Sequence, residues 1–302
     1  MPSRPDLEKQ IRNPNIQDTL RRNYLKKYSD YVGRDVILYA SAYTSRKFSL
    51  SNIPQFFISL NDEDIQGFMS ANQGMSNDKL DLILHSPGGS PNSAQQIVSY
   101  LRQRYKHIRA VVPQNAMSAA TMIACACDEI IMAKHSAIGP IDPQIGTVSP
   151  DGLQMFIPAR SIIEEFDKAK SEVIQHPELA TLWFTRINSY PTGFYAQCEN
   201  LLKNSREIVE QWLLHYMFEN KKEENAKCIS IAKFLSEHKD HGTPINCETA
   251  QSIGLKIIPL ENDQTLQENL LSIFHTTMIT FDITKCVKII ENHEAKGFYV
   301  IV

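Results

Sequence analysis

His85-Ser-Pro-Gly-Gly89 stands between an apolar run at residues 80–84 and a helix-like stretch that opens at Ser90. Ser90 suits the N-cap of that helix, and Pro91 suits its first turn. Two consecutive glycines expose backbone N–H groups that no side chain shields. Such a turn can bind the oxyanion of an acyl transfer, or it can be a tight turn and nothing more. It lacks the lysine and the Ser/Thr of a phosphate-binding loop.

A second turn follows the next apolar run, in Asn115-Ala-Met-Ser118-Ala-Ala-Thr121. A serine between a strand and a helix can present its hydroxyl to a cleft, and small neighbours let a substrate backbone come close. The hydroxyl is a weak nucleophile unless a base lies within hydrogen-bonding reach. The alternative is that Ser118 serves only as the N-cap of the following helix.

Outward from these turns, strand-like and helix-like stretches alternate, which is typical of an α/β fold with a largely parallel sheet. We predict strands at 36–40, 80–84, 108–112 and 129–133, and helices at 62–72, from residue 91, and at 118–127. After Gln144 the pattern becomes helical, with predicted helices at 158–175, 194–219 and 222–238. Residues 242–260 return to strands and turns, followed by a helix near 264–277 and an apolar end at 297–302.

This pattern predicts a helical arm at residues 1–30, a catalytic domain at 31–260 and a C-terminal extension at 261–302. The catalytic domain carries a helical insertion at about 158–238. The arm interleaves basic residues with apolar ones, so its basic face is either solvated or in contact with a partner.

Composition excludes several classes of protein. The 302 residues carry 31 Lys and Arg against 34 Asp and Glu, a net charge of −3, which argues against nucleic-acid binding driven by bulk charge. No apolar window of 18 residues predicts a transmembrane helix, and the polar start has no signal-peptide core. We interpret the six cysteines as buried small hydrophobes in a reducing compartment, and we expect a cytoplasmic protein.

The two turns together resemble those of the Clp protease proteolytic subunit and its crotonase-fold relatives. A closer resemblance, to the serine dehydrogenase proteinase family of bacterial and archaeal Clp-fold serine proteases, spans residues 30 to 260 and the tail stretch Lys288-Ile-Ile-Glu-Asn-His293. Its motifs are His85–Gly89, Val112-Pro-Gln-Asn-Ala-Met-Ser118, Met122-Ile-Ala-Cys125 and Gly139-Pro-Ile-Asp-Pro-Gln144. The resemblance implies a ClpP/crotonase-like fold with a helical insertion and terminal extensions. The sequence departs from the family at Ala120, where glycine is usual, and this methyl group narrows the space beside the nucleophile.

The resemblance implies a serine peptidase with a Ser-Asp-His triad in that chain order. Ser118 matches the nucleophile, and the amides of Gly89 and Ala119 match the oxyanion donors, with Gly88 shaping the turn. Asp142 stands in a rigid Gly/Pro loop where Clp protease carries its triad histidine. His241 precedes an EA…GL segment at nearly the spacing of the Clp triad aspartate, so the two roles are exchanged.

Other residues remain open as the base. Lys170 stands where the related signal peptide peptidase A places a dyad lysine, but it belongs to a strongly charged helix, and a lysine base must be desolvated. His275 lies in the family-like tail and is a second reserve. No metal or organic cofactor is implied.

We therefore predict hydrolysis of peptides or proteins by a self-associating enzyme. Because the chain has no ATPase motif, large substrates need a separate unfolding or activating partner. The alternatives are a crotonase-like enzyme acting on acyl-CoA thioesters and a scaffold subunit with a dead site. The absence of a G-x-G-x-x-G turn argues against a nucleotide-dependent oxidoreductase.

Overall fold

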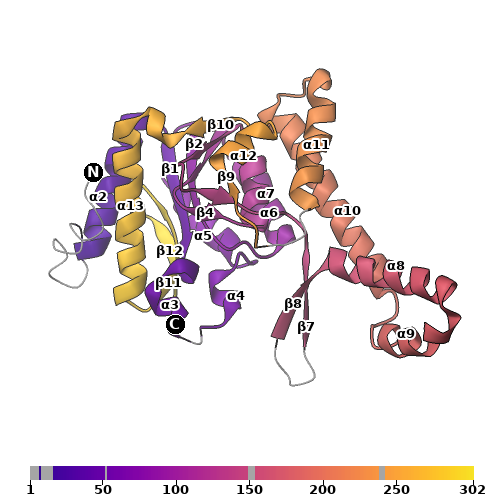
Figure 1. Ribbon diagram of the computed structural model, residues 1–302. Helices are drawn as coiled ribbons and strands as arrows, with labels where there is room; N and C mark the ends of the chain where they lie inside the picture. The colour runs from indigo at the N-terminus through magenta and orange to yellow at the C-terminus, as the bar shows by residue number, and fades with distance from the viewer. Residues whose placement is uncertain (1–6, 8–15, 52, 149–153, 238–241) are drawn as a thin grey trace.

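The structure is a computed structural model that describes residues 7, 16–51, 53–148, 154–237 and 242–302. A seven-stranded sheet forms its centre (Figure 1). In spatial order the strands are β10 (Ile257–Pro259), β5 (Glu129–Met132), β3 (His107–Val112), β2 (Lys79–His85), β1 (Asp35–Ser41), β11 (Cys286–Asn292) and β12 (Gly297–Ile301). The first five run parallel to one another, β11 pairs antiparallel with β1, and β12 pairs antiparallel with β11. The predicted α/β fold with a largely parallel core is confirmed.

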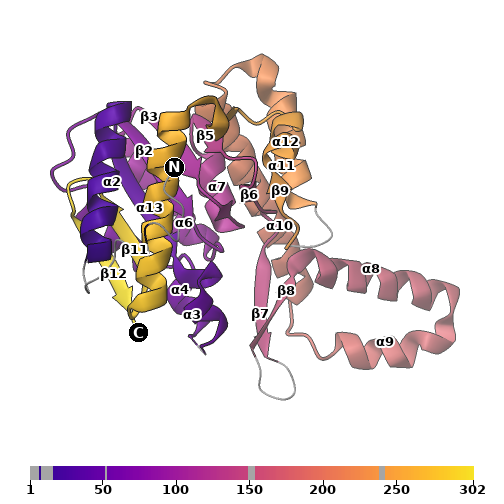
Figure 2. The same ribbon diagram turned by 60° about the vertical axis from the view of Figure 1, so that its left-hand side comes forward.

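Helices cover both faces of this sheet (Figures 1 and 2). One face packs against α2 (Ile16–Val32) and α13 (Gln264–Ile283), and the other against α5 (Asp64–Ala71), α6 (Pro91–Arg104) and α7 (Ala119–Cys125). Along β1, Ile37 and Tyr39 join one core, while Val36, Leu38 and Ala40 join the other. A strand buried on both faces needs a continuous apolar run rather than an alternating one, and the sequence has that run here.

Smaller elements surround the sheet. A separate three-stranded sheet contains β4 (Asn115–Ala116), β6 (Ala137–Ile138) and β9 (Ile245–Asn246). Short helices lie at η1 (Ala42–Thr44), α3 (Arg46–Ser49), α4 (Gln55–Ile58), α12 (Cys247–Ser252) and η5 (Leu260–Asn262). The predicted start of α6 is confirmed, because the Ser90 side chain accepts a hydrogen bond from the Ser93 amide and Pro91 is the first helical residue.

Residues 144–148 and 154–207, here called the projecting segment, extend away from the sheet (Figure 2). The segment consists of β7 (Gln144–Val148), β8 (Gln154–Pro158), α8 (Ala159–Gln175), η2 (Pro177–Leu179), α9 (Ala180–Ile187) and most of α10 (Phe194–Trp212), whose end at Val209 joins the main core. The chain then returns to the main core through η3 (Leu213–Met217), η4 (Lys222–Glu224) and α11 (Asn225–Ser236). The sequence pattern did not indicate the β7–β8 hairpin or α9.

The division into arm, catalytic domain and extension stays a prediction. In the structure, β11 and β12 from the end of the chain belong to the same sheet as β1. Helix α2 packs against α13, so residues from both ends of the chain complete one face of the core.

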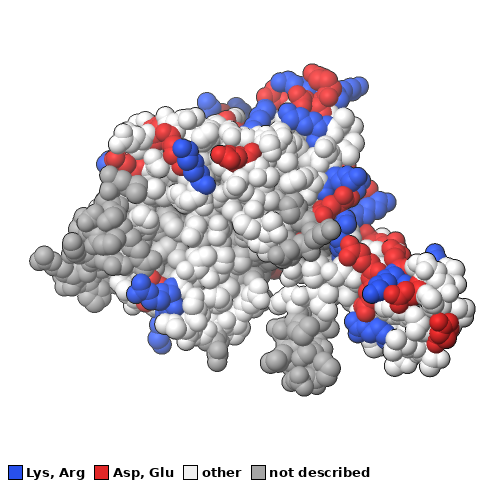
Figure 3. Space-filling model, in the orientation of Figure 1, with Lys and Arg blue, Asp and Glu red and all other residues white. Residues whose placement is uncertain are grey.

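The distribution of charged side chains and the state of the cysteines both match what the composition indicates. Basic and acidic side chains lie interspersed over the projecting segment and α11, on the face that Figure 3 displays. All six cysteines are buried free thiols, as predicted. Across the described ranges, no helix is long and apolar enough to cross a membrane.

A buried ion cluster joins the two ends of the chain. Arg21 on α2 donates to Glu291 on β11 (Nε to Oε2, 2.8 Å) and to Thr280 on α13 (Nη1 to Oγ1, 2.9 Å). The side chains of Arg21 and Glu291 are both fully buried. Glu291 also accepts from the partly exposed Arg22 on α2 (Nε to Oε1, 2.6 Å), so removing Arg21 takes away its buried cation and leaves the exposed one. Losing a buried charged partner still costs more than breaking an exposed pair.

Arg21→Met is therefore expected to lower the free energy of unfolding by about 1.5–3 kcal/mol. Urea unfolding followed by circular dichroism measures this difference. The control is Lys26→Met on the same helix, whose exposed pair with Glu294 is expected to contribute no more than about 1 kcal/mol. Equal losses for the two variants would mean that the cluster does not anchor α2.

Candidate active site

Ser118 has a strained backbone at the start of α7. Its φ of 49° and ψ of −117° are unusual for a residue with a side chain, and its hydroxyl makes no capping hydrogen bond. Ser118 thus occupies the N-cap position of α7, but its side chain does not cap the helix. Strain of this kind costs about 1–3 kcal/mol and persists where surrounding contacts enforce it, most often at functional sites. Ser118 is partly exposed, whereas the following Ala119 and Ala120 are buried.

Backbone contacts on both sides enforce this turn. The Met117 amide donates to Ser86 O at 2.9 Å, and the Ser86 amide donates to Asn115 O at 3.1 Å. On the other side, Thr121 Oγ1 donates to Ala116 O at 2.7 Å and accepts from the Gly139 amide at 2.9 Å. The turn before Ser118 is therefore held between the glycine turn and the loop after β6.

Gly88 and Gly89 lie where a side chain would not fit. A Cβ on Gly88 would lie 2.7 Å from Ser118 Cβ and 2.9 Å from the Ala119 nitrogen. A Cβ on Gly89 would lie 2.2 Å from Leu60 O, and both glycines have positive φ values of 93° and 148°. The structure thus brings Gly88, Ser118 and Ala119 into direct contact.

Asp142 follows a strand that is paired beside the one leading to Ser118. Strand β6 pairs in parallel with β4, matching Ile138 to Ala116, so the loops after both strands leave from the same edge. The first residue of the β6 loop, Gly139, lies so close to Met117 that a Cβ on it would be 2.6 Å from Met117 Cε. Asp142 itself is only 1% exposed.

Strand β9 brings a third segment to this edge. It runs antiparallel to β6, matching Ile245 to Ile138, so residues 242–244 enter β9 where the Asp142 loop leaves β6. His241 lies outside the described residues, and its role stays a prediction.

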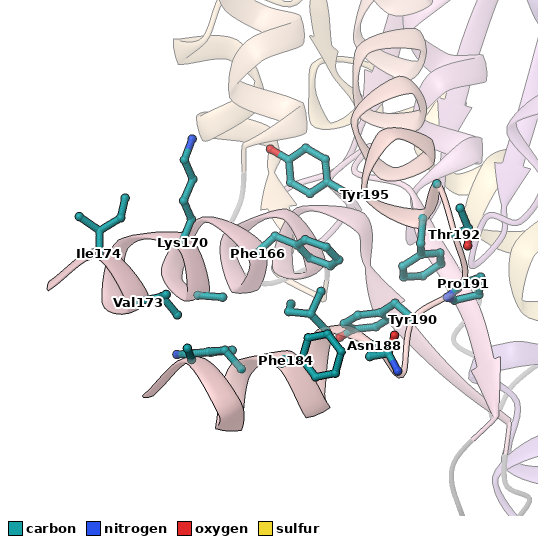
Figure 4. Close-up of a pocket in the computed structure, with 16 residues that line it drawn as sticks. Phe166, Lys170, Val173, Ile174, Phe184, Asn188, Tyr190, Pro191, Thr192 and Tyr195 are labelled. Atoms are coloured by element: carbon teal, nitrogen blue, oxygen red, sulfur yellow. The ribbon is translucent and has the colours of Figure 1, made fainter. Parts of the chain in front are cut away.

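The other candidate bases are not gathered at this edge. His275 belongs to α13, which covers the opposite face of the sheet from α7. Lys170 is exposed on α8 of the projecting segment. It borders a pocket of about 650 Å³ whose lining residues all fall within 166–195, so Ser118 does not line that pocket. Figure 4 shows the Lys170 amine directed away from Phe184 and Tyr190.

Leu60, which the sequence did not indicate, also contacts the glycine turn. Its amide donates to Gly88 O at 2.7 Å, and its carbonyl accepts from the Ser90 amide at 2.8 Å. These two bonds hold the glycine turn from the side opposite Ser118. Nothing in the sequence around Leu60 signals this role, because the contacts are made by the backbone.

His85 is a buried neighbour of the glycine turn rather than an exposed wall of a cleft. Its ring stacks on Tyr43 at 4.8 Å between centroids, meets Phe274 edge-on at 4.9 Å, and has Nε2 2.9 Å from Thr44 Oγ1. Burial lowers the pKa of His85 to about 3. The imidazole is therefore neutral at physiological pH, and it packs as part of the core.

This burial predicts a pH-dependent stability. The unfolded chain binds a proton at His85 near pH 6.5, whereas the folded chain does so only near pH 3. Between these values the free energy of unfolding is expected to fall as the pH falls, by up to about 1.4 kcal/mol per pH unit from this group. Urea unfolding of wild type and His85→Gln between pH 7 and pH 4 measures the effect as a difference. Parallel pH profiles would contradict the prediction.

Two curated relatives come from Methanocaldococcus jannaschii and carry the names "Uncharacterized protein MJ0137" and "Uncharacterized protein MJ1495". The first is 31% identical over 216 residues, 69% of this chain and 63% of that protein. The second is 29% identical over 178 residues, 59% of this chain and 51% of that protein. The matched part of this chain thus spans less than two thirds of either relative.

Two solved structures also match, both of a "1510-N membrane-bound stomatin-specific protease". One is a serine-to-alanine mutant, with a TM-score of 0.39, 15% identity and coverage of 68% of this chain and 77% of that one. The other is a lysine-to-alanine mutant in complex with a substrate peptide, with a TM-score of 0.38, 16% identity and coverage of 76% and 73%.

The sequence profile of the ClpP-like SDH-type serine proteinases matches residues 7–281. This range contains the sheet strands from β1 to β10, the glycine turn, the Ser118 turn and the Asp142 loop. The chain therefore belongs to the family of ClpP-like SDH-type serine proteinases.

Proposed function

We propose that this protein is a serine peptidase that hydrolyses peptide bonds with Ser118 as its nucleophile. The observation that carries the proposal is the strained turn of Ser118, whose hydroxyl is not used for capping and whose Cβ lies against Gly88. A nucleophilic serine on a sharp strand-to-helix turn, with backbone amides beside it, is the arrangement that acyl transfer needs.

In the proposed reaction, Ser118 Oγ attacks the carbonyl carbon of the scissile peptide and gives its proton to the His241 imidazole. The resulting oxyanion accepts hydrogen bonds from the Gly89 and Ala119 amides, while Gly88 keeps the space beside Ser118 open. The C–N bond then breaks as His241 returns the proton to the leaving amine. A water molecule, activated by the same histidine, hydrolyses the acyl-enzyme and regenerates Ser118.

Asp142 is proposed to orient the imidazole of His241 and to stabilise its charged form. Three features support this role: the burial of Asp142, its place after β6, and the entry of residues 242–244 at the same edge. The assignment of His241 itself rests on the family resemblance, which places the histidine before the segment at Glu248–Leu255.

We also propose that the protein self-associates and that it is located in the cytoplasm. Ile174, Leu182 and Phe184 are 67–72% exposed on the projecting segment, and apolar side chains this exposed favour contact with a partner. Light scattering that finds only a 34.3 kDa species would contradict self-association. Free buried thiols are typical of a reducing compartment, and cell fractionation tests the location.

The nucleophile is tested with Ser118→Ala. Peptide hydrolysis is expected to fall at least about 10³-fold, because the attacking oxygen is gone. Labelling by a fluorophosphonate probe, followed by intact-mass analysis, is expected to disappear as well. The unfolding midpoint should change little, because the hydroxyl makes no capping hydrogen bond.

The same assay compares the candidate bases. His241→Ala is expected to lose activity as Ser118→Ala does, while Lys170→Met and His275→Gln keep most of it. Loss of activity in Lys170→Met alone would replace the triad with a Ser–Lys dyad. Turnover of an acyl-CoA thioester that survives Ser118→Ala would instead indicate crotonase-like chemistry, and a wild type that never labels would indicate a dead scaffold.

A further inference from the structure

Lys288 and Asp64 form a buried ion pair beside the glycine turn. Lys288 Nζ lies 2.7 Å from Asp64 Oδ1, and the two side chains are 1% and 0% exposed. The other carboxylate oxygen, Oδ2, accepts from the Tyr39 hydroxyl at 2.8 Å. Lys288 belongs to β11 near the end of the chain and Asp64 to the first turn of α5, so the pair joins remote segments.

The pair holds the backbone on both sides of Leu60. Lys288 Nζ donates to Ser59 O at 2.7 Å, and Asp64 Oδ2 accepts from the Asn61 amide at 3.0 Å. The two charged groups thus bind the residues that flank Leu60, one through a carbonyl and the other through an amide. Charge-assisted hydrogen bonds of this kind are shorter and stronger than neutral ones.

The Leu60 backbone links these charged groups to the glycine turn through two hydrogen bonds. Its amide and carbonyl bind Gly88 O and the Ser90 amide, so Leu60 pairs with Gly89 like a strand residue. The Gly88 carbonyl and the Gly89 N–H belong to one trans peptide bond, so they point in opposite directions. Because Gly88 O and the Ser90 amide face Leu60, the Gly89 amide between them points away from Leu60.

Burying two charges contributes little net stability, since desolvation offsets their attraction. Burial lowers the pKa of the Lys288 ammonium and raises the pKa of the Asp64 carboxyl, and each partner opposes the shift of the other. A buried ion pair that adds little net stability can still fix the positions of the backbone groups to which it is hydrogen-bonded. Oxyanion donors need to be held within about 0.5 Å of their working position.

We propose that Lys288 and Asp64 are positioning residues that hold the Gly89 amide in place for the oxyanion, acting through Leu60. This inference rests on the peptidase function proposed above. Neither residue touches the substrate, so their loss should weaken binding of the tetrahedral state while leaving the binding of the peptide itself nearly unchanged.

The test compares wild type with Lys288→Met, which keeps the apolar stem and removes the ammonium. Two inhibitors with the same peptide sequence are used. A peptide aldehyde adds to Ser118 Oγ and forms a hemiacetal whose oxygen takes the place of the oxyanion, whereas the matching alcohol cannot form that adduct. We expect kcat and the affinity for the aldehyde to fall about 10- to 100-fold, with KM and the affinity for the alcohol nearly unchanged.

The control is Arg102→Met, which removes another buried cation. Arg102 Nη1 binds Asp128 Oδ2 at 2.8 Å, and its Nε binds Ala126 O at 3.1 Å, beyond the far end of α7 from Ser118. This variant should lose stability while keeping the wild-type ratio of aldehyde to alcohol affinity. An equal fall of that ratio in both variants would assign the effect to general destabilisation and overturn the inference.

If Lys288→Met alone does not fold, the double variant Lys288→Met with Asp64→Asn removes both charges and keeps an acceptor for the Asn61 amide. It still lacks the donor to Ser59 O, so the same loss of aldehyde affinity is expected. A third variant, Lys288→Arg, keeps a cationic donor at this position. Its kcat is expected to lie between that of wild type and that of the variants without a donor.

The two proposals fail in different ways. A wild type that neither hydrolyses peptides nor labels at Ser118 would remove the peptidase function. An active wild type beside a folded Lys288 variant with an unchanged aldehyde-to-alcohol ratio would overturn only the positioning role.

Discussion

The site depends on the contact between Gly88 and Ser118. A single added carbon on residue 88 would lie within 3 Å of the Met117 carbonyl, the Ser118 Cβ and the Ala119 amide. Two turns that follow different strands therefore meet with no room for any side chain between them. Other features adjoin this contact. The Leu60 hydrogen bonds hold the glycine turn, the loop after β6 packs against Met117, and the Ser118 backbone is strained where the two turns meet.

Local physical chemistry made much of the fold predictable. The buried strands are visible in the sequence as apolar runs. Ser90 and Pro91 mark the start of α6, because capping and proline preferences depend only on residues within one helical turn. Local signals of this kind do not reveal elements that form through contacts between distant segments. Strands β4, β6 and β9 are two residues long each, too short for any periodic signal, and they exist only because three distant segments pair.

For the candidate site, the sequence indicates residue types but not their geometry. Ser118 and the glycines stand out because of their neighbours, yet a capping serine and a strained one have the same sequence signal. Leu60 acts through its backbone, so its identity carries no information about its role. Lys288 offered one hint, because a charge among the apolar residues at 286–290 needs a buried partner, but only the fold identifies Asp64 as that partner.

The place of β11 in the sheet has a consequence for how the protein is made. Ribosomes release a chain from its N-terminus, so the strands that carry the glycine and serine turns emerge long before β11, which pairs with β1 from the other side. A nascent chain can therefore bring the glycine turn and the Ser118 turn together while the segment around Leu60 still lacks the ammonium of Lys288. Synthesis and folding are thereby coupled, because the backbone on both sides of Leu60 gains its full set of hydrogen bonds only after β11 has been translated and has paired with β1.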